Sequence, residues 1–311
     1  LDHSRFAEAM EAGFVRLLSA EQADDAVRTA FYRARAESRP VVLSAPADIQ
    51  QADVLDDEPY AVSRDLLPAG PGLPNPDELA RAVDLIASSR RPVILAGRGA
   101  VASGAGAQVE ALAERIGAIV ATTLLAKNWL AASPYHAGIS GLYSTAAAMD
   151  VLSAADCVIA VGAGLNNDTV AHGYLYPEAR FVQIDVRPNA LMGGGRCADA
   201  YLHADAAAAL DLLSARLDGR GHRQTGYRTA DVAERLAGAA VDDRPFELEP
   251  GTLDTRDVCR RLDECTPPDV GLVLGGGHAV QIATMTCNRP RELMLANQHF
   301  GCIGQGLTTA M

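Results

Sequence analysis

Several residue patterns are missing from this sequence, and each absence excludes a class of protein. No apolar run approaches the roughly 20 residues of a membrane-spanning helix, so we expect no membrane partner. No charged segment followed by an apolar one forms a secretory leader. The six cysteines include no Cys-x-x-Cys pair, which argues against a zinc site or a disulfide framework and favours a reducing, cytoplasmic location.

Basic residues are outnumbered, and lysine is nearly absent. The chain carries 27 Lys plus Arg against 39 Asp plus Glu, a formal net charge of -12, and Lys127 is its only lysine. Because neutralising phosphates requires clustered Lys and Arg, we expect no nucleic-acid partner. The preference for arginine, like the heavy use of alanine and glycine, is typical of biased codon usage.

Apolar residues are plentiful, but they occur in short segments. Hydrophobic residues make up 49% and charged residues 21%, which is enough for a sizeable core and excludes a wholly disordered chain. Short apolar strands alternate with helices between residues 77 and 222. This alternation predicts an α/β fold with a doubly wound parallel-sheet middle domain, covered by helices on both faces.

Segments rich in proline, glycine and charge divide the chain. We expect 1–55 to close a first α/β domain, 56–76 to be a linker, 77–222 the middle domain, 223–254 a second linker and 255–311 the start of a further α/β domain. Within the first part, the amphipathic pattern of Ala7–Arg35 predicts two helices, the second over Ala23–Glu37, and Pro40–Ser44 is predicted to be a short buried strand. Neither Leu1 nor Met311 reads as a natural terminus, so we expect a piece of a longer protein.

Two glycine turns follow predicted strands of the middle domain. Gly97 and Gly99 come after the strand Pro92–Ala96, and Gly162 comes after another apolar strand. Each is either a tight structural turn or a backbone contact for a nucleotide phosphate. Asp185, at the end of a later strand, either accepts hydrogen bonds from a ribose or caps a loop.

Two glycine-rich segments near the C-terminus are more specific candidates for a ligand-binding site. Gly275–Gly277 follow a predicted strand and precede a helix, which gives a backbone surface suited to an anion such as a diphosphate, with His278 as a further donor. The alternative is a flexible turn with a capping histidine. Glycines at 301, 304 and 306 surround Ile303, which is either a wedge beside a ligand or part of a structural loop.

Recognisable catalytic and metal patterns are missing. The serines lie in no Gly-x-Ser-x-Gly elbow, and the seven histidines show no metal spacing. From residues alone, the sequence therefore identifies neither catalytic nor metal-binding side chains.

The order of segments along the chain is more informative than any one motif. The segments in question are Arg39–Gln50, Arg91–Gly97, Ala121–Thr123 with Lys127, His136–Gly138, Gly141, Ala155–Gly162, Gln183–Asp185, Gly276–His278 and Gly301–Leu307. Their collinear order, over nearly the whole chain, resembles that of thiamine-diphosphate-dependent enzymes of the acetolactate-synthase-like family.

The resemblance implies a fold, a chemistry and an assembly. The three α/β domains would be the end of the pyrimidine-binding domain, the middle domain and the start of the diphosphate-binding domain. The cofactors would be thiamine diphosphate and Mg²⁺, and the reaction would be decarboxylation, carboligation or both, on a small 2-oxo acid. A homo-oligomer, dimeric or tetrameric, would follow, because the family's site lies between chains.

The resemblance also assigns residues. Gly276, Gly277 and His278 match diphosphate-contacting positions, and Ile303 matches the aliphatic residue that holds the cofactor in its bent form. Gly301 and Gly304 flank it, and the Gly301 backbone is expected to bond the aminopyrimidine. The activating glutamate and the metal-binding motif fall outside residues 1–311, so we expect this chain alone to be inactive.

The sequence departs from the family pattern in three places. Leu274 stands where many relatives have an acid, Thr308 replaces a proline, and residues 164–168 lack the arginine and aromatic residue that hold FAD. We therefore expect no FAD in the middle domain. Two alternatives stay open: a cofactor-free assembly or regulatory relative, and a nucleotide-binding α/β protein of another class.

Overall fold

The computed structural model describes residues 2–37, 39–53, 60–66, 72–187, 197–222, 226–238, 245, 247–289, 291, 293–296 and 303–311. The chain folds as two compact units, Leu1–Gly70 and Pro71–Met311, which we describe separately. The division between the units falls inside the first predicted linker. The full set of predicted domain boundaries remains a prediction.

The first unit contains a small parallel sheet packed on a helix. Strands β1 (Gly13–Arg16) and β2 (Val41–Ser44) pair in register from Gly13 opposite Val41, and α2 (Ala23–Ala36) buries Ala26 and Ala30. Shorter helices complete the unit: α1 (His3–Ala9), α3 (Ala47–Gln50), η1 (Ala20–Gln22) and η2 (Ser63–Leu66).

Two predictions for this unit are wrong. The second predicted helix, Ala23–Glu37, is confirmed as α2, but the helical pattern predicted before it is wrong, because β1 interrupts it to pair with β2. The strand predicted as buried is partly open, since Val42 and Leu43 of β2 are 38% and 36% exposed.

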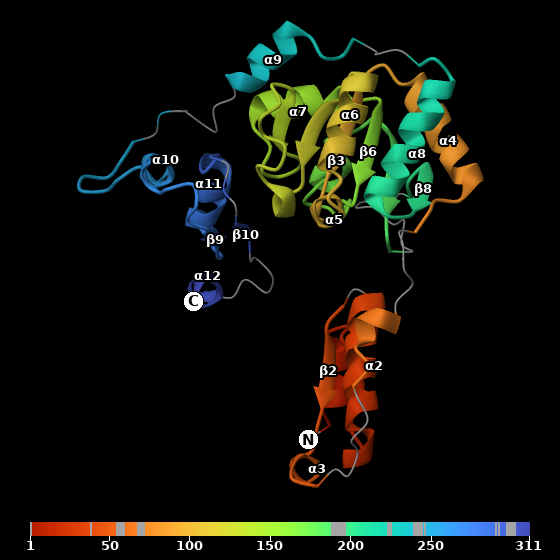
Figure 1. Ribbon diagram of the computed structural model, residues 1–311. Coiled ribbons are helices and arrows are strands. Elements are labelled where there is room, and N and C mark those ends of the chain that lie inside the picture. The colour runs from red at the N-terminus through yellow and green to blue at the C-terminus, as the bar shows by residue number, and fades with distance from the viewer. Residues whose placement is uncertain are drawn as a thin grey trace. The chain divides into compact units, whose positions relative to one another are not determined.

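The second unit contains a six-stranded parallel sheet in the order β5-β4-β3-β6-β7-β8 (Figure 1). Its first strand in the chain, β3, lies inside the sheet, and later strands are added first on one side and then on the other. This order is that of a doubly wound sheet, so the predicted fold class is confirmed. The strands are β3 (Pro92–Ala96), β4 (Ile119–Thr122), β5 (His136–Ile139), β6 (Cys157–Val161), β7 (Arg180–Asp185) and β8 (Ala200–His203).

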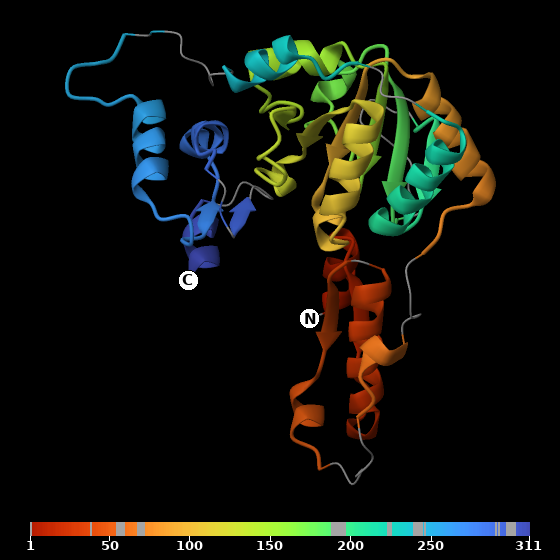
Figure 2. The same ribbon diagram turned by 45° about the horizontal axis from the view of Figure 1, so that its top comes forward.

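Alternate residues of each strand pack into two apolar cores, one on each face of the sheet. In β3, Ile94 packs into the core that also contains residues of α4, α6 and α8, whereas Val93 and Leu95 pack into the core beneath α7. Figures 1 and 2 show the helices that cover the sheet. Because β3, β4 and β6 are buried along their whole length, they read as continuous apolar runs. The helices are α4 (Pro76–Ser88), α5 (Arg98–Ala102), α6 (Gly106–Ile116), α7 (Ala146–Ser153) and α8 (Ala206–Gly219).

Polar caps fix where these helices begin. The Asn75 side chain accepts hydrogen bonds from the backbone N–H of Asp77 (2.8 Å) and of Glu78 (3.4 Å), and Pro76 occupies the first turn of α4. Asp205 caps α8 in the same way, through the N–H of Ala208 at 3.0 Å.

β5 and α9 (Ala230–Ala237) are among the elements of this unit that were not predicted. β5 contains Gly138 with a positive φ of 77°, and its pairing with β4 shifts register. Helix α9 lies in the stretch predicted as the second linker, and Val232 packs into the core beneath α7.

The C-terminal part of this unit begins a second parallel sheet. Strands β9 (Leu272–Leu274) and β10 (Met294–Ala296) pair with Leu272 opposite Met294, and α11 (His278–Thr286) connects them. Helix α10 (Thr255–Cys265) precedes β9, and α12 (Gln305–Ala310) follows β10. Each strand is thus followed by a helix, so both helix N-termini lie toward the carboxyl ends of the strands.

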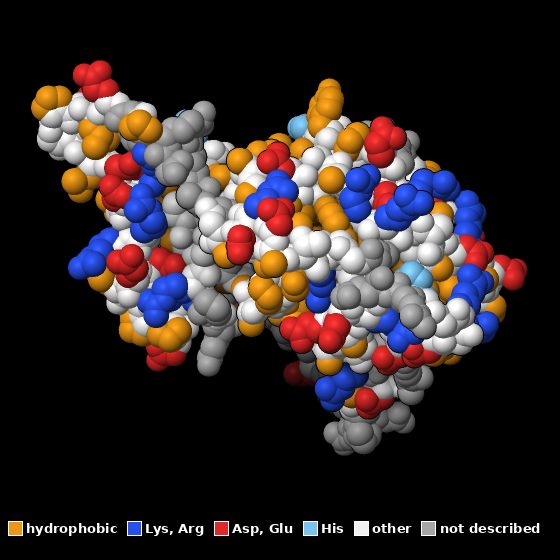
Figure 3. All heavy atoms as spheres, turned by 90° about the horizontal axis from the view of Figure 1, so that it is seen from above, with side chains coloured by type: hydrophobic (Ala, Val, Ile, Leu, Met, Phe, Trp, Pro, Cys, Tyr) orange, Lys and Arg blue, Asp and Glu red, His pale blue; other side chains and the backbone are white. Residues whose placement is uncertain are grey.

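Charges of both signs lie side by side on the surface. On the face shown in Figure 3, basic and acidic side chains are interleaved, and ion pairs such as Arg180–Asp199 (2.6 Å) and Arg235–Asp150 (3.5 Å) occur in this unit. This mixing differs from the clustered basic patch of a nucleic-acid-binding protein. Each helix among the described residues is too short or too polar to cross a lipid bilayer.

Candidate functional site

The candidate site lies at the carboxyl edge of the β9–β10 pair, where two glycine segments meet. Gly275 follows β9, and Gly306 lies in the first turn of α12. A Cβ atom at Gly306 would lie 2.9 Å from the Gly275 Cα atom, and one at Gly275 would lie 3.2 Å from the Gly306 nitrogen. Because real Cβ atoms are essentially never found within 3.0 Å of backbone, Gly306 must be glycine for the two segments to touch, and a side chain at Gly275 would require the neighbouring backbone to shift by a few tenths of an ångström.

The glycines beside this contact leave open space. Gly276 and Gly277 have no heavy atom within 4 Å of where a Cβ would stand, and neither does Gly304. Gly277 (φ 98°) and Gly304 (φ 90°) precede α11 and α12 with positive φ angles, which favour glycine. The result is a thin, exposed backbone surface at the start of α11, where a helix presents unbonded N–H groups and a partial positive charge.

The two predicted side chains lie at this edge and are exposed. His278 is the first residue of α11, and its side chain is exposed. Ile303, directly before Gly304, is 99% exposed, so it is not a core residue of the described part of the chain. Gly301 lies outside the described residues. The roles predicted for all these residues remain predictions.

Sequence reasoning missed the importance of Gly275 and Gly306. The pattern of glycines around Ile303 did not indicate which part of the chain lies next to Gly306. The structure identifies that neighbour as the turn after β9, which is a long-range contact without a local sequence signal.

The glycine turns of the middle domain pack against each other. A Cβ at Gly97 would lie 2.3 Å from the Gly162 carbonyl oxygen, and one at Gly162 would lie 2.3 Å from the Ala100 nitrogen. The Gly99 N–H donates to the Gly162 carbonyl at 2.9 Å. Of the two alternatives left open for these turns, the structure supports the tight structural turn.

Asp185 likewise acts locally. Its Oδ1 atom accepts a hydrogen bond from the Arg187 N–H at 2.9 Å, just after β7 ends. This bond matches the loop-cap alternative rather than a carboxylate waiting for a ribose hydroxyl.

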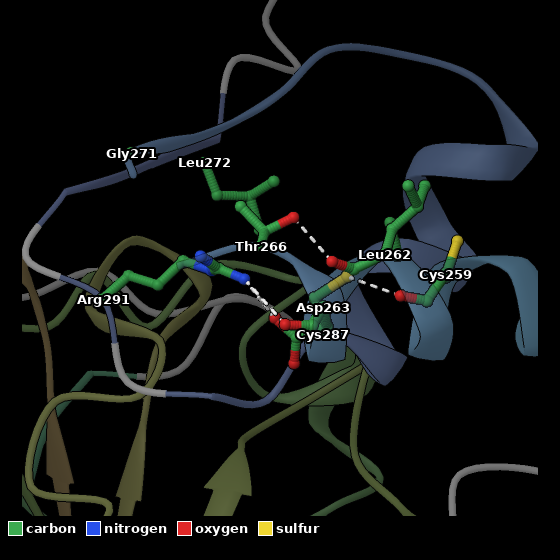
Figure 4. Close-up of a pocket in the computed structure, with 9 residues that line it drawn as sticks. Cys259, Leu262, Asp263, Thr266, Gly271, Leu272, Cys287 and Arg291 are labelled. Atoms are coloured by element: carbon green, nitrogen blue, oxygen red, sulfur yellow. Dashed lines mark hydrogen bonds and ion pairs between the residues drawn. The ribbon is translucent and has the colours of Figure 1, made fainter. Parts of the chain in front are cut away.

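A pocket of about 110 Å³ lies at the opposite, amino end of β9 (Figure 4). Its lining comes from α10, α11 and the start of β9: Cys259, Leu262, Asp263, Thr266, Gly271, Leu272, Ala283, Cys287 and Arg291. In α/β sheets, ligands bind beyond the carboxyl ends of parallel strands, so this pocket lies at the less suitable edge.

A buried ion pair forms one wall of that pocket. Arg291 Nη2 lies 2.7 Å from Asp263 Oδ1, with only 3% and 7% of the two side chains exposed. The second carboxylate oxygen accepts from the Arg289 N–H at 3.0 Å, and Arg291 Nη1 donates to the Pro267 carbonyl at 2.9 Å. Because these partners hold the end of α10 against the start of β10, we regard the cluster as structural.

Comparisons with known proteins agree with the fold and the order of segments. Residues 79–213 match the family described as "Thiamine pyrophosphate enzyme, central domain". Those residues include the six-stranded sheet and most of the helices that cover it. The middle part of the chain therefore matches the central domain of this family.

Individual relatives extend the similarity beyond that domain. The chain is 28% identical to a probable acetolactate synthase large subunit of Methanocaldococcus jannaschii, over 88% of this chain and 47% of the relative. It is 31% identical to a sulfoacetaldehyde acetyltransferase of Rhodobacter capsulatus, over 88% and 50%. It is 32% identical to a probable 2-ketoarginine decarboxylase of Pseudomonas aeruginosa, over 93% and 50%.

The predicted resemblance to the acetolactate-synthase-like family is thus confirmed over most of the chain. The chain spans about half the length of the curated relatives that it matches.

Proposed function

We propose that this chain is part of a thiamine-diphosphate-dependent enzyme that decarboxylates a small 2-oxo acid, transfers the resulting fragment to an acceptor, or does both. The observation that carries the proposal is the collinear match to such enzymes over most of the chain. It is supported by an open glycine edge at the position that the family resemblance assigns to the diphosphate.

The residues at that edge fit a diphosphate. Gly276 and Gly277 leave space for a ligand to approach the backbone, and α11, a helix of nine residues, directs its N-terminus at that space. A partial positive charge and free N–H groups there favour an anion. His278, exposed at the same turn, would add a side-chain donor. In the described part of the chain, no group of three or more His, Cys, Asp or Glu residues could hold a metal ion, so we assign no residue to Mg²⁺.

The chain's own contribution is binding and orientation. When bound, thiamine diphosphate supplies a nucleophilic carbon and an electron sink for decarboxylation. Gly276, Gly277 and His278 would hold its diphosphate, and Ile303, beside Gly304, would pack against the cofactor in its bent form.

We further propose that the protein is a homo-oligomer, dimeric or tetrameric. Light scattering on an active preparation would test this, and a monomer mass would contradict it.

Calorimetric titration of the protein with thiamine diphosphate and Mg²⁺ tests the proposal, with FAD and ADP as competing ligands. A matched pair of variants locates the site. Gly277→Ala should weaken thiamine-diphosphate binding at least tenfold, about 1.4 kcal/mol. Gly251→Ala should not weaken it, although Gly251 also has a positive φ (84°) and open space around it.

Other outcomes would favour the rival functions. Binding of none of the three ligands would favour a cofactor-free relative. Saturable binding of FAD or ADP without thiamine diphosphate would favour a nucleotide-binding protein. Equal effects of the two glycine variants would contradict the placement of the site at α11.

A further inference from the structure

The turn after β4 binds the segment that follows α11. Lys127 in this turn is 8% exposed, and its ammonium group donates to the Asn288 Oδ1 atom at 2.6 Å. The neighbouring Asn128 donates from Nδ2 to the Arg289 carbonyl at 3.2 Å. The start of the connection, η3 (Leu124–Ala126), contacts β10. This part of the middle domain therefore touches both the end of α11 and the strand that comes after it.

The hydrogen bond from Lys127 continues into α11. Asn288 accepts from Lys127 with its Oδ1 atom and donates from Nδ2 to the Met285 carbonyl, in the last turn of the helix, at 3.0 Å. A cation at this end of a helix is favoured, because the last carbonyls carry a partial negative charge. From another direction, the Arg289 N–H donates to Asp263 of α10 at 3.0 Å. The end of α11 is thus held from two sides.

Two features of this turn favour a role beyond packing. Asn128 and Leu130 have positive φ angles of 65° and 64°, a strained backbone conformation that is uncommon for leucine. Lys127 is the chain's only lysine, and its buried ammonium group donates to two neutral amide oxygens, those of Asn128 (3.0 Å) and Asn288. Backbone strain and a buried charge both lower stability, and strained residues cluster at functional sites.

The opposite end of α11 carries the glycine edge that we assign to the diphosphate. Gly277 precedes the helix and Asn288 follows shortly after it, and nine helical residues span about 13 Å. Lys127 therefore contacts α11 at the end remote from the diphosphate. It can still influence that site, because a tilt of roughly 10° about the Asn288 end moves the first turn by about 2 Å. Displacements of about 1 Å already impair a site that must hold a ligand in one geometry.

We propose that Lys127 is a positioning residue for the thiamine-diphosphate site, which it holds in place through Asn288 and α11. The inference rests on the proposed function and deepens it, because it adds a residue of the middle domain to a site built by the C-terminal part of the chain. Without the Lys127 bond, α11 populates other arrangements, and only a fraction of the molecules is ready to bind. The apparent affinity for the cofactor falls by that fraction, although no contact to the cofactor is removed.

Calorimetric titration with thiamine diphosphate and Mg²⁺ compares the wild-type protein with two variants. Lys127→Met keeps the length of the side chain but cannot donate, and it should weaken binding about tenfold, or about 1.4 kcal/mol. Arg228→Met is the control, because Arg228 is partly buried and donates to the Ala118 carbonyl at 2.6 Å, beside the amino end of β4. This variant should leave the affinity near wild type. If Lys127 only packed the middle domain, both variants would bind the cofactor equally well.

The protonation of Lys127 provides a readout that packing alone would not change. Burial lowers the pKa of Lys127 from 10.5 to about 8, and the nearby Cys287 and Asp263 oppose this only partly. Asp263 is itself paired with Arg291, and burial raises the pKa of the Cys287 thiol. His136 also interacts electrostatically with Lys127, but burial lowers the pKa of His136 to about 4, so its ring is neutral above pH 7. Between pH 7 and 9, Lys127 is therefore the group among these that loses its charge.

Cofactor affinity and the pKa of Lys127 should then be coupled. The ammonium form is the stronger donor, so affinity should fall about threefold as the pH rises from 7 to 9. By linkage, saturating cofactor should raise the pKa of Lys127 by about half a pH unit, which is the same coupling. Because the chain has one lysine, protein labelled with ¹³C at the lysine Cε position gives a single lysine resonance whose pH titration measures this pKa.

A further variant separates positioning from the charge of the cofactor itself. The negative charge of bound thiamine diphosphate, acting through space, would raise the pKa of Lys127 in Asn288→Ala as much as in the wild type. Positioning requires the Asn288 link, so the rise should be largely lost in Asn288→Ala. This comparison also decides the inference if Lys127→Met does not fold.

The failures of the two proposals are distinguishable. A wild-type protein that binds no thiamine diphosphate overturns the proposed function and this inference together. Normal binding by the wild type and by Lys127→Met overturns the inference alone, and so does equal weakening in Arg228→Met. A Lys127 pKa that the cofactor leaves unchanged, or raises equally in Asn288→Ala, also overturns it.

Discussion

At the scale of single residues, the most exposed candidate is also the most easily tested. Ile303 is 99% exposed, so Ile303→Ala should change the free energy of unfolding by less than about 0.5 kcal/mol, whereas a buried Ile→Ala change costs roughly 2–5 kcal/mol. If Ile303 presses against thiamine diphosphate, the same change should weaken cofactor binding about tenfold. Urea unfolding and calorimetric titration of one preparation measure both quantities.

The control for Ile303 lies on the next helix. Leu307, in α12, is 71% exposed and has no proposed contact with the cofactor. Leu307→Ala should leave both stability and cofactor affinity near wild type. A large loss of stability in Ile303→Ala with normal cofactor affinity would show that Ile303 is an ordinary packing residue.

For Arg291 we predict the opposite of what we predict for Ile303: its substitution should lower stability without affecting cofactor binding. Arg291→Met removes the partner of a buried carboxylate, and leaving Asp263 unpaired should cost about 3–5 kcal/mol of unfolding free energy. Arg261→Met breaks an exposed pair with Glu264, whose side chains are 78% and 64% exposed, and should cost at most about 0.5 kcal/mol. Equal costs in chemical denaturation would mean that the buried pair is not important for stability.

At the scale of elements, the contact between the turns after β3 and β6 should be intolerant of any side chain. Gly162 has a φ of 53°, and a Cβ there would lie 2.3 Å from the Ala100 nitrogen. Gly162→Ala should therefore destabilise the second unit by more than the about 1–2 kcal/mol that positive φ alone costs. Gly164→Ala, two residues away in open space with an ordinary φ, is the matched control and should be nearly neutral. Thermal unfolding that ranked the two variants equally would refute the close contact.

The elements predicted from sequence are those with a strong local signal. β3 and β6 are uninterrupted apolar runs, and the start of α4 is indicated by Asn75, which caps the helix, and by Pro76 in its first turn. β1 was not predicted, because its four residues form a strand only by pairing with β2, in which Val41 lies opposite Gly13. β5 was not predicted, because Gly138 adopts a positive φ angle, which is not part of any sequence pattern typical of a strand.

The candidate site divides in the same way. The glycine turns could be located from sequence, since runs of glycine after a strand have a recognisable chemistry. The contact between Gly275 and Gly306, and the burial of Lys127 against Asn288, depend on packing between residues far apart in the chain. From the sequence alone we attributed the scarcity of lysine to codon usage, whereas the fold shows that Lys127 is buried and donates to two neutral amides.

At the scale of the whole molecule, buried basic groups should make stability depend on pH in two separate windows. The folded-state pKa of His136 is lowered from 6.5 to about 4, and that of Lys127 from 10.5 to about 8. Between each pair of values the unfolded chain binds a proton that the folded chain does not. Stability therefore rises with pH across each window and falls as the pH is lowered through it.

The acidic window gives the sharper prediction. As the pH falls from 6.5 to about 4, His136 should cost the folded state up to about 1.4 kcal/mol per pH unit, because one proton separates the two states. His136→Phe removes this titration, so its unfolding free energy should depend less steeply on pH there, although the lost acceptor for the Gly138 N–H lowers its stability equally at every pH. Urea unfolding of both proteins across the window measures the two slopes. Parallel slopes would show that His136 gains a proton in the folded protein as readily as in the unfolded chain, which would contradict its lowered pKa.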